Sequence, residues 1–420
     1  MNIAAIALVA FVVLQFRNIQ RAQQIAGILL LAIAFFVSLS QSNVIEVFET
    51  GVLKTLPFLL VFASVGWLRA AAWESPSVAD LRAALSRMGP GRRFAAFILS
   101  AHTMGAGFNL AGLGLLAPML DDGRENTIEG MRLRCAIMWG FAAATCWSPF
   151  FVGTAAVLAT MPGLRWPQVV PYGLLIAAGF LIYATVYDRF VRRRGGVRRQ
   201  GVAEKLDLGP AVARLLLAIT VLFVITLTLV EGTHLKLTTA IALSAPTYSL
   251  AWLWLVHGRK NAPRVAQIAR SVLAGYSGMR TETTLFVCAN IFGAAVASML
   301  ASGDAGGIAM PGLTGVMFVD AVLVIWIYLA VCAVGLHPII LLVVFTTVTD
   351  PASLGIPLPL MAATMMALWG MGTSVSPLSG TTLFMSQMSP VSSFVIAWRW
   401  NGVFVILSTF WVAAVLTLFS

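Results

Sequence analysis

Twelve long apolar runs determine what this chain of 420 residues can fold into. A helix that crosses a bilayer needs about 20 mostly apolar residues, and the hydrocarbon interior admits only backbone whose polar groups bond to one another. Charged residues make up 10% of the chain, which is too few to cover a water-exposed surface, because soluble domains carry about 25%. The sequence therefore predicts an all-α polytopic membrane protein in a lipid bilayer. The runs span residues 2–15, 25–42, 51–70, 94–119, 133–160, 167–188, 210–230, 236–256, 281–302, 312–349, 357–385 and 402–419.

Arginine-rich loops separate several of these runs and hold most of the net charge of +11. Short loops rich in Lys and Arg stay on the cytoplasmic side of a membrane. We therefore expect all four clusters on that side of a bacterial-type inner membrane, which the chain crosses several times. A nucleic acid partner is not expected, because no soluble domain is present to carry a basic patch. The clusters are Arg17 and Arg21; Arg82, Arg87, Arg92 and Arg93; Arg189, Arg192, Arg193, Arg194, Arg198, Arg199 and Lys205; and Arg259, Lys260, Arg264 and Arg270.

The number of runs between the second and third clusters contradicts a simple series of crossings. Three runs lie between them, and three crossings would place the loop 189–199 on the wrong side. One run must therefore enter and leave on the same side, and the run 94–119 is the best candidate. It is rich in glycine and polar residues, which suits a re-entrant hairpin buried in protein or lining a wet cavity. We expect its tip near Gly107-Phe108-Asn109, and a return to the cytoplasm before Arg124, Arg132 and Arg134.

A second hairpin is expected in the run 312–349. Its 38 residues are too many for one crossing and few for two crossings joined by a loop. We predict its tip near Gly335-Leu336-His337-Pro338. With one hairpin in each half, each half has five full crossings. Because five is odd, a second copy of the first half would be upside down relative to it.

Ordered matches along the sequence indicate that the two halves are indeed copies. We therefore predict two inverted repeats, residues 1–200 and 201–420, each with five transmembrane helices plus a re-entrant hairpin. Inverted repeats with discontinuous helices are typical of secondary transporters, since one site served by similar machinery from both faces permits alternating access. The matches are Lys54-Thr55 with Arg280-Thr281, Trp139-Gly140 with Trp369-Gly370, Ser148-Pro149 with Ser376-Pro377, and Gly153-Thr154 with Gly380-Thr381.

The runs 133–160 and 357–385 are predicted to be discontinuous helices, because Pro149 and Pro377 each remove a backbone donor within an apolar run. The free N–H groups of a broken helix suit an anion, and its free carbonyl groups suit Na⁺. The alternative is that the neighbouring hydroxyl groups only bond their own helix backbone. The candidate substrate-binding residues, from these helices and the hairpins, are Ser100, His102, Thr103, Asn109, Thr145, Ser148, His337, Thr373, Ser374, Ser376, Ser379, Thr381 and Thr382.

Ionisable and amide side chains at membrane depth are further functional candidates. His102 and His337 lie in matching places on the two hairpins, and they either carry a coupling proton or shape the tips through hydrogen bonds. Glu282 opens the ninth run, where it either pairs with Arg280 at the interface or binds a cation or a proton. Na⁺ is the only metal ion expected. The candidate coupling-ion residues are Asn109, Asn290, Glu282, Gly372 and Gly380.

The segment from Ser376 to Thr382 resembles the SPLSDTT motif of the NhaC-type antiporters, with Gly380 in place of the Asp. It is also similar to the S-x-x-G-T-P-P-N stretch of the divalent anion/sodium symporters, without the prolines and the Asn. At these residues the chain resembles the ion transporter superfamily, and the resemblance in architecture covers its whole length. It implies two inverted repeats, substrate and ion sites at the hairpin tips and broken helices, and a homodimer.

These observations predict a secondary active transporter of a small-molecule anion, an organic carboxylate, coupled to Na⁺ or H⁺. The alternative is a sodium/proton antiporter, which needs a carboxylate in its core, and Glu282 and Asp320 are the candidates. A channel is disfavoured, because a pore needs no inverted pair of broken helices. The sequence has no paired carboxylates, Ser/His/Asp set, phosphate-binding loop or HExxH motif. We therefore expect no enzymatic activity and no cofactor.

Overall fold

A computed structural model describes residues 3–120, 127–161, 163–192, 209–258, 261–302, 314–348 and 355–420. Within these ranges all regular secondary structure is helical. Nine helical stretches in the same ranges are long and apolar enough to cross a bilayer. The prediction of an all-α, multi-pass membrane protein is thereby confirmed. Several predicted residues lie outside the described ranges: Arg124, Arg193, Arg194, Arg198, Arg199, Lys205, Arg259, Lys260, and residues 312, 313 and 349 of the second predicted hairpin.

The first half of the chain forms nine α-helices within the described residues, and the second half forms another nine. The first nine are α1 (Ile3–Gln15), α2 (Arg21–Ser40), α3 (Val44–Trp73), α4 (Pro76–Arg87), α5 (Pro90–Phe108), α6 (Leu110–Leu116), α7 (Ile128–Thr145), α8 (Val152–Thr160) and α9 (Trp166–Phe190). The others are α10 (Gly209–Thr233), α11 (Leu237–His257), α12 (Ala262–Ala274), α13 (Arg280–Ala301), α14 (Met317–Val334), α15 (Pro338–Val348), α16 (Leu358–Val375), α17 (Gly380–Gln387) and α18 (Gly402–Phe419).

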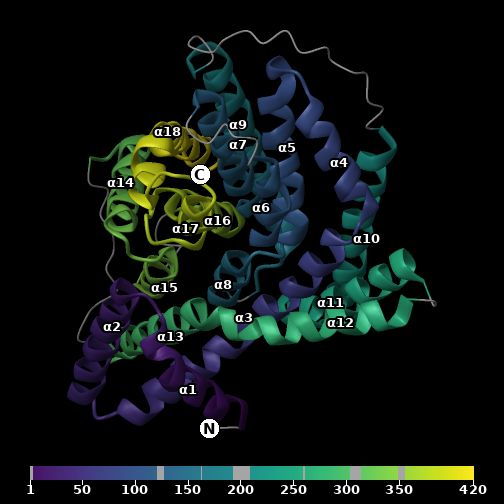
Figure 1. The fold of residues 1–420 in the computed structure, drawn as a ribbon. Helices are drawn as coiled ribbons and strands as arrows, with labels where there is room; N and C mark the ends of the chain where they lie inside the picture. Colours follow the sequence, from purple (N-terminus) through teal and green to yellow (C-terminus); the bar gives the residue numbers. More distant parts are fainter. Residues whose placement is uncertain are drawn as a thin grey trace.

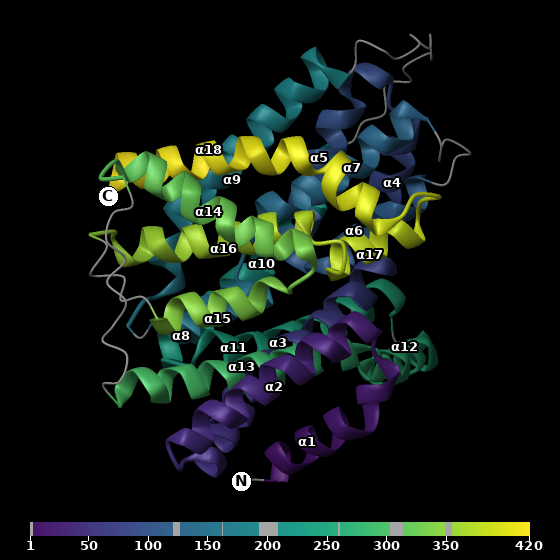
Figure 2. The same ribbon diagram turned by 90° about the vertical axis from the view of Figure 1, so that its left-hand side faces the viewer.

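Two layers of helices make up the bundle (Figures 1 and 2). One layer contains α1, α2, α3, α11, α12 and α13, and the other contains α5 to α9 and α14 to α18. In the first layer α3 packs along α11 and α13 packs along α2, so each half of the chain supplies a partner to the other. Glycine allows the two long helices to touch, since a Cβ at Gly51 of α3 would lie 2.4 Å from the Cα of Ile291 of α13.

The arginines gather at one end of the bundle. Figure 2 places α4, α12 and the last turn of α9 at this end, and the C-terminus at the other. Arg82 and Arg87 belong to α4, Arg264 and Arg270 to α12, and Arg189 to α9. Neither α4 nor α12 was predicted from the sequence, because both are short and amphipathic and lie in segments read as loops. Members of three of the four arginine clusters thus lie on one side.

The chain reverses direction at Asn109, between α5 and α6. Asn109 has a positive φ of 53°, a conformation that Asn tolerates better than most residues, and its side-chain oxygen accepts a hydrogen bond from the backbone nitrogen of Leu110 at 2.6 Å. A Cβ at Gly112 would lie 2.6 Å from the carbonyl carbon of Met104, so glycine lets α6 fold back onto α5. Arg93 at the start of α5 donates to Glu129 at the start of α7 (3.1 Å), so the start of α7 lies beside the start of α5.

A second reversal lies between α14 and α15, at Gly335, Leu336 and His337. Gly335 has a φ of 116°, which favours glycine. Tyr328 closes the turn, because its hydroxyl group donates to the carbonyl oxygen of Pro338 at 3.4 Å. The two arms of this hairpin both contact α16, whereas α5 and α6 contact each other. Both reversals lie at the residues where the sequence predicts hairpin tips.

Both runs predicted to be discontinuous are interrupted at their Ser-Pro pair. Helix α7 ends at Thr145 and α8 begins at Val152, while α16 ends at Val375 and α17 begins at Gly380. The same kind of hydrogen bond occurs in both breaks. The hydroxyl group of Thr154 donates to the carbonyl oxygen of Ser148, and the hydroxyl group of Thr382 donates to that of Ser376, each at 2.6 Å. Thr154 and Thr382 therefore make equivalent hydrogen bonds, whereas the sequence match pairs Gly153-Thr154 with Gly380-Thr381.

Candidate functional site

A cavity of about 890 Å³ lies between the two layers, where both hairpin tips meet the broken helices. Its walls come from α3, α12, α13, the α5–α6 tip, the α14–α15 tip and both pairs of broken helices. Ligand pockets typically have volumes of about 300–1,000 Å³. The space therefore accommodates a small organic molecule.

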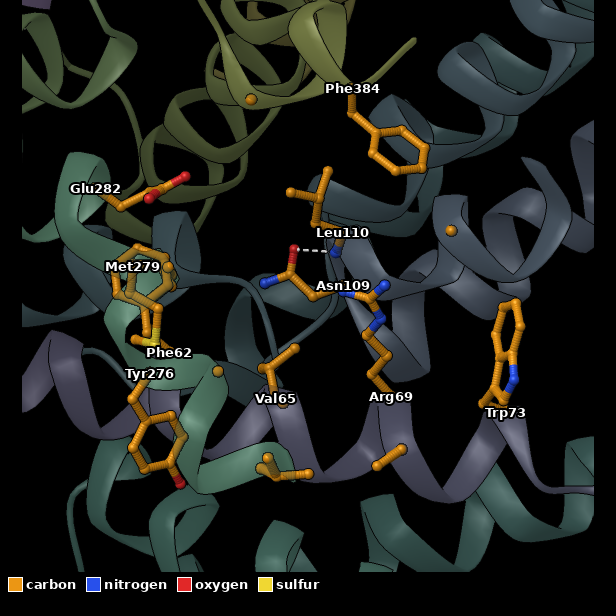
Figure 3. A pocket seen from close by; sticks show the side chains of 18 of the residues that line it. Phe62, Val65, Arg69, Trp73, Asn109, Leu110, Tyr276, Met279, Glu282 and Phe384 are labelled. Atoms are coloured by element: carbon orange, nitrogen blue, oxygen red, sulfur yellow. Dashed lines mark hydrogen bonds between the residues drawn. The ribbon is translucent and has the colours of Figure 1, made fainter. Parts of the chain in front are cut away.

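Arg69 supplies a cation to this cavity. It lies on α3 about one turn before the end of the helix, and Figure 3 shows its side chain beside Asn109 and Leu110. Its Nη2 atom lies 4.0 Å from the position that a Cβ at Gly114 would occupy. The side chain is exposed to the cavity, and within the described ranges it makes no hydrogen bond or ion pair. An unpaired guanidinium in such a space attracts an anion.

Glu282 supplies a carboxylate to the same cavity from the first turn of α13. It is half-buried, and its Oε1 atom lies 3.9 Å from the position of a Cβ at Gly380, where α17 begins. Its carboxylate bonds to no other side chain in the part of the chain that the structure describes. The expected interfacial pair with Arg280 is therefore not formed among these residues. Figure 3 shows Glu282 and Arg69 on opposite sides of Asn109.

Three polar side chains predicted for the site line the cavity, and each also bonds the backbone. The hydroxyl group of Thr381 donates to the carbonyl oxygen of Thr373 at 2.9 Å, and that of Thr373 to Gly370 at 3.1 Å. The amide nitrogen of Asn109 donates to the carbonyl oxygen of Phe150 at 3.1 Å. Asn109 thus ties the tip of the first hairpin to the break between α7 and α8. Of the three, only Thr373 bonds the backbone of its own helix, as the alternative for the hydroxyl groups expects, and all three side chains border the cavity.

The two histidines have different surroundings. His337 lines the cavity beside the rings of Trp369 and Phe286. His102 lies away from it and accepts a hydrogen bond from the indole nitrogen of Trp147 at 3.3 Å. The structure therefore brings only His337 to the candidate site.

The other predicted residues do not line the cavity. Most of those whose side chains form hydrogen bonds form them with the backbone. Ser148 donates to the carbonyl oxygen of Ala106 at 2.6 Å, and Asn290 donates to that of Phe286 at 2.9 Å. A Cβ at Gly372 would lie 2.9 Å from Pro338, so this glycine lets the second hairpin approach α16. The predicted residues outside the cavity are Ser100, His102, Thr103, Thr145, Ser148, Ser374, Ser376, Ser379, Thr382, Asn290 and Gly372, and those that line it are Asn109, His337, Thr373, Thr381, Glu282 and Gly380.

A cluster of charges on α3, α11 and α12 marks the end of the cavity nearest the arginine-rich side. Arg264 donates to Glu74 at 2.8 Å, and His257 lies 3.1 Å from the same carboxylate. Sequence reasoning missed this cluster and also missed Arg69. An arginine in the last turn of an apolar run was the available signal, since charged side chains at membrane depth mark functional sites.

The sequence matches no known family model and no curated protein. The fold resembles a solved structure, the YdaH transporter of Alcanivorax borkumensis, with a TM-score of 0.53 and 14% sequence identity. The alignment covers 86% of this chain and 85% of the YdaH chain. A likeness at this identity concerns the fold. The resemblance to the ion transporter superfamily stays a prediction.

Proposed function

We propose that this chain is a secondary active transporter of a small organic anion, coupled to Na⁺ or H⁺. The observation that carries the proposal is the guanidinium of Arg69, which pairs with none of the described residues and lies in a cavity bordered by both hairpin tips and both pairs of broken helices. The likeness of the fold to the YdaH transporter supports transport in general. A carboxylate is the anion that best matches the forked donors of arginine.

Arg69 would hold the carboxylate of the substrate through paired hydrogen bonds. Two unit charges about 4 Å apart attract by about 4 kcal/mol at an effective dielectric constant near 20, the value for sites at a protein surface. The polar faces of Asn109 and Thr381 would border the bound molecule, and the aromatic rings of Phe62 and Trp369 would contact its apolar part.

The two hairpins give the proposal its mechanism. In this proposal they are re-entrant and belong to inverted repeats, so that the α5–α6 tip approaches the cavity from one face of the membrane and the α14–α15 tip from the other. The arginine-rich end would be cytoplasmic. Because Glu74 and Arg264 border the cavity at that end, the conformation described would be the one that faces the cytoplasm.

Replacing Arg69 tests the proposal. Purified protein is screened by thermal denaturation against sodium salts of mono-, di- and tricarboxylates, since a ligand that binds the folded state raises its stability. Uptake of the best stabiliser is then measured in proteoliposomes with Na⁺ and proton gradients. A hydrogen bond to a charged group contributes about 1.5–3 kcal/mol. We therefore expect Arg69→Gln to weaken binding roughly 10- to 150-fold and Arg69→Lys to have an intermediate effect.

A matched variant controls for the loss of a positive charge. Arg214 on α10 is exposed and lies 3.4 Å from the equally exposed Asp80. We expect Arg214→Gln to leave carboxylate binding and uptake unchanged. If Arg69→Gln bound and transported the carboxylate as well as the unmodified protein, the site assignment would be wrong.

The alternative function is a sodium/proton antiporter, and the position of Glu282 favours it. Its carboxylate reaches the cavity and bonds to no other side chain within the described ranges. Na⁺ pulses given to vesicles that contain a pH-sensitive dye separate the two functions. An antiporter dissipates the proton gradient without any carboxylate, and Glu282→Gln abolishes that response.

A further inference from the structure

Four of the described charged side chains line the cavity. Glu74 and Arg264 pair with each other, whereas Arg69 and Glu282 have no ion partner among the described residues. Arg69 comes from α3 and Glu282 from α13, the two long helices of one layer. Arg69 and Glu282 do not pair with each other, and the described residues of the opposing layer supply neither with an ion partner. A ligand that fills the cavity displaces water from both charges, and a charge that loses its water is costly unless it is paired. Because both side chains face one cavity, a ligand with one negative and one positive group is the one that neutralises both.

The places of the two charges along the cavity follow from contacts with α6 and α17. At Gly114, a Cβ would lie 4.0 Å from Nη2 of Arg69 and 3.9 Å from the ring of Phe384. At Gly380, a Cβ would lie 3.9 Å from Oε1 of Glu282 and 3.7 Å from Leu110. Leu110 and Gly114 are four residues apart on α6, as are Gly380 and Phe384 on α17. The two charges are therefore offset by about one helical turn, roughly 6 Å along these helices.

A simple anion satisfies only half of this arrangement. Its carboxylate would neutralise Arg69 but leave Glu282 without a counter-charge, and the added negative charge would repel that of Glu282. A simple cation would neutralise Glu282 but leave Arg69 without a counter-charge and be repelled by its guanidinium. A molecule with a carboxylate and an ammonium group neutralises both side chains at once.

We propose that the substrate is a zwitterion, an amino acid or another aminocarboxylate, whose carboxylate binds Arg69 and whose ammonium group binds Glu282. This inference rests on the proposed function, keeps Arg69 as the carboxylate site and narrows the substrate from a simple anion to a carboxylate that also carries an ammonium group. Figure 3 shows Phe62 and Met279 on the side of Glu282, and Val65 between them and Arg69. This wall suits a substrate with an aromatic or long aliphatic body.

The test uses sets of three compounds that share a body and differ in charge. One set is L-phenylalanine, 3-phenylpropionate and 2-phenylethylamine, and another is 4-aminobutyrate, butyrate and butylamine. The remaining standard amino acids and their deaminated acids complete the panel. Thermal denaturation of the purified full chain gives an apparent affinity for each compound at pH 5 to 8. The proteins compared are the unmodified chain, Glu282→Gln, Arg69→Gln and the control Arg214→Gln.

At least one zwitterion is expected to bind tenfold or more tightly than its deaminated acid and its amine. Glu282→Gln should remove that preference, so that the zwitterion and the acid bind alike. Arg69→Gln should weaken both, and Arg214→Gln should change neither. If the Glu282→Gln variant still bound the zwitterion more tightly than the deaminated acid, the assignment of Glu282 as the ammonium site would be wrong.

Two other outcomes overturn the inference in distinguishable ways. If acids bind through Arg69 as tightly as zwitterions, and Glu282→Gln only removes the pH dependence of acid binding, then Glu282 carries a proton. In that case the anion transporter stands and the zwitterion is excluded. If no compound of the panel stabilises the protein and Arg69→Gln changes nothing, the proposed function itself fails.

Discussion

The buried ion pair between Arg132 and Asp188 offers a sharp test of the packing around the broken helices. Arg132 lies in the first turns of α7, and Asp188 lies in the last turn of α9. The guanidinium donates from Nε at 2.7 Å and from Nη2 at 2.6 Å to the two carboxylate oxygens. The side chains are 9% and 4% exposed. This forked geometry satisfies both charges, which makes their burial in the protein tolerable.

Removing one partner should cost far more than removing both. Asp188→Asn leaves the Arg132 charge buried without a counter-ion, and breaking such a pair typically costs about 3–5 kcal/mol. Arg132→Met combined with Asp188→Leu removes both charges and keeps apolar volume. Replacing a buried pair in this way is often neutral. We therefore expect the double variant to be more stable than either single variant.

An exposed pair of the same chemistry supplies the control. Arg165 donates to Glu231 at 2.9 Å, but these side chains are 64% and 43% exposed. Exposed pairs contribute about 0–1 kcal/mol, so Glu231→Gln should have a correspondingly small effect. Free energies of unfolding are measured by titrating dodecyl sulfate into mixed micelles, with tryptophan fluorescence as the signal. Equal losses for Asp188→Asn and Glu231→Gln, or a double variant as unstable as the single ones, would refute the reasoning.

Two further predictions concern packing and sidedness. Gly370→Ala should lower the free energy of unfolding by about 1–3 kcal/mol, because its Cβ would lie 2.2 Å from Oγ1 of Thr145 where α16 crosses α7. Gly232→Ala is the control. Its Cβ would have nothing within 4 Å, so this variant should be neutral or slightly stabilising in the same titration. Single cysteines at the exposed positions Ser86 and Thr233 should react with an impermeant maleimide from opposite faces of oriented vesicles, since the four natural cysteines are buried; labelling of both from one face contradicts the bundle orientation.

The sequence predicts most of the fold because lipid imposes simple requirements on length and polarity. The run 402–419 coincides with α18, and the run 133–160 contains the break between α7 and α8. The first hairpin reverses at Asn109, within the predicted tip, because the glycine and polar residues there allow a turn that a lipid-facing helix would not tolerate. The amphipathic helices α4 and α12 could not be predicted in this way, since they lack long apolar runs and carry the arginines that mark loops.

The candidate site was only partly predictable, because residue type does not reveal the direction of a side chain. Ser148 and Thr382 lie beside the breaks, as expected, but their hydroxyl groups bond the backbone and do not line the cavity. Arg69 was overlooked for a different reason. At the end of an apolar run an arginine looks like an interfacial anchor, and only the packing of α6 and α17 beside α3 shows that it lies in a cavity.

The matched sequence motifs have different surroundings in the two halves. Trp139 bonds to Asn401 at 2.8 Å and stacks on Phe404, whereas its counterpart Trp369 lines the cavity. The charges are equally asymmetric, because aligning Lys54-Thr55 with Arg280-Thr281 places Leu56 opposite Glu282 and Ala295 opposite Arg69. Neither charge has a counterpart in the other half. A likeness between the halves can therefore predict where the hairpins and breaks lie, but the chemistry of the cavity depends on side chains that the likeness does not include.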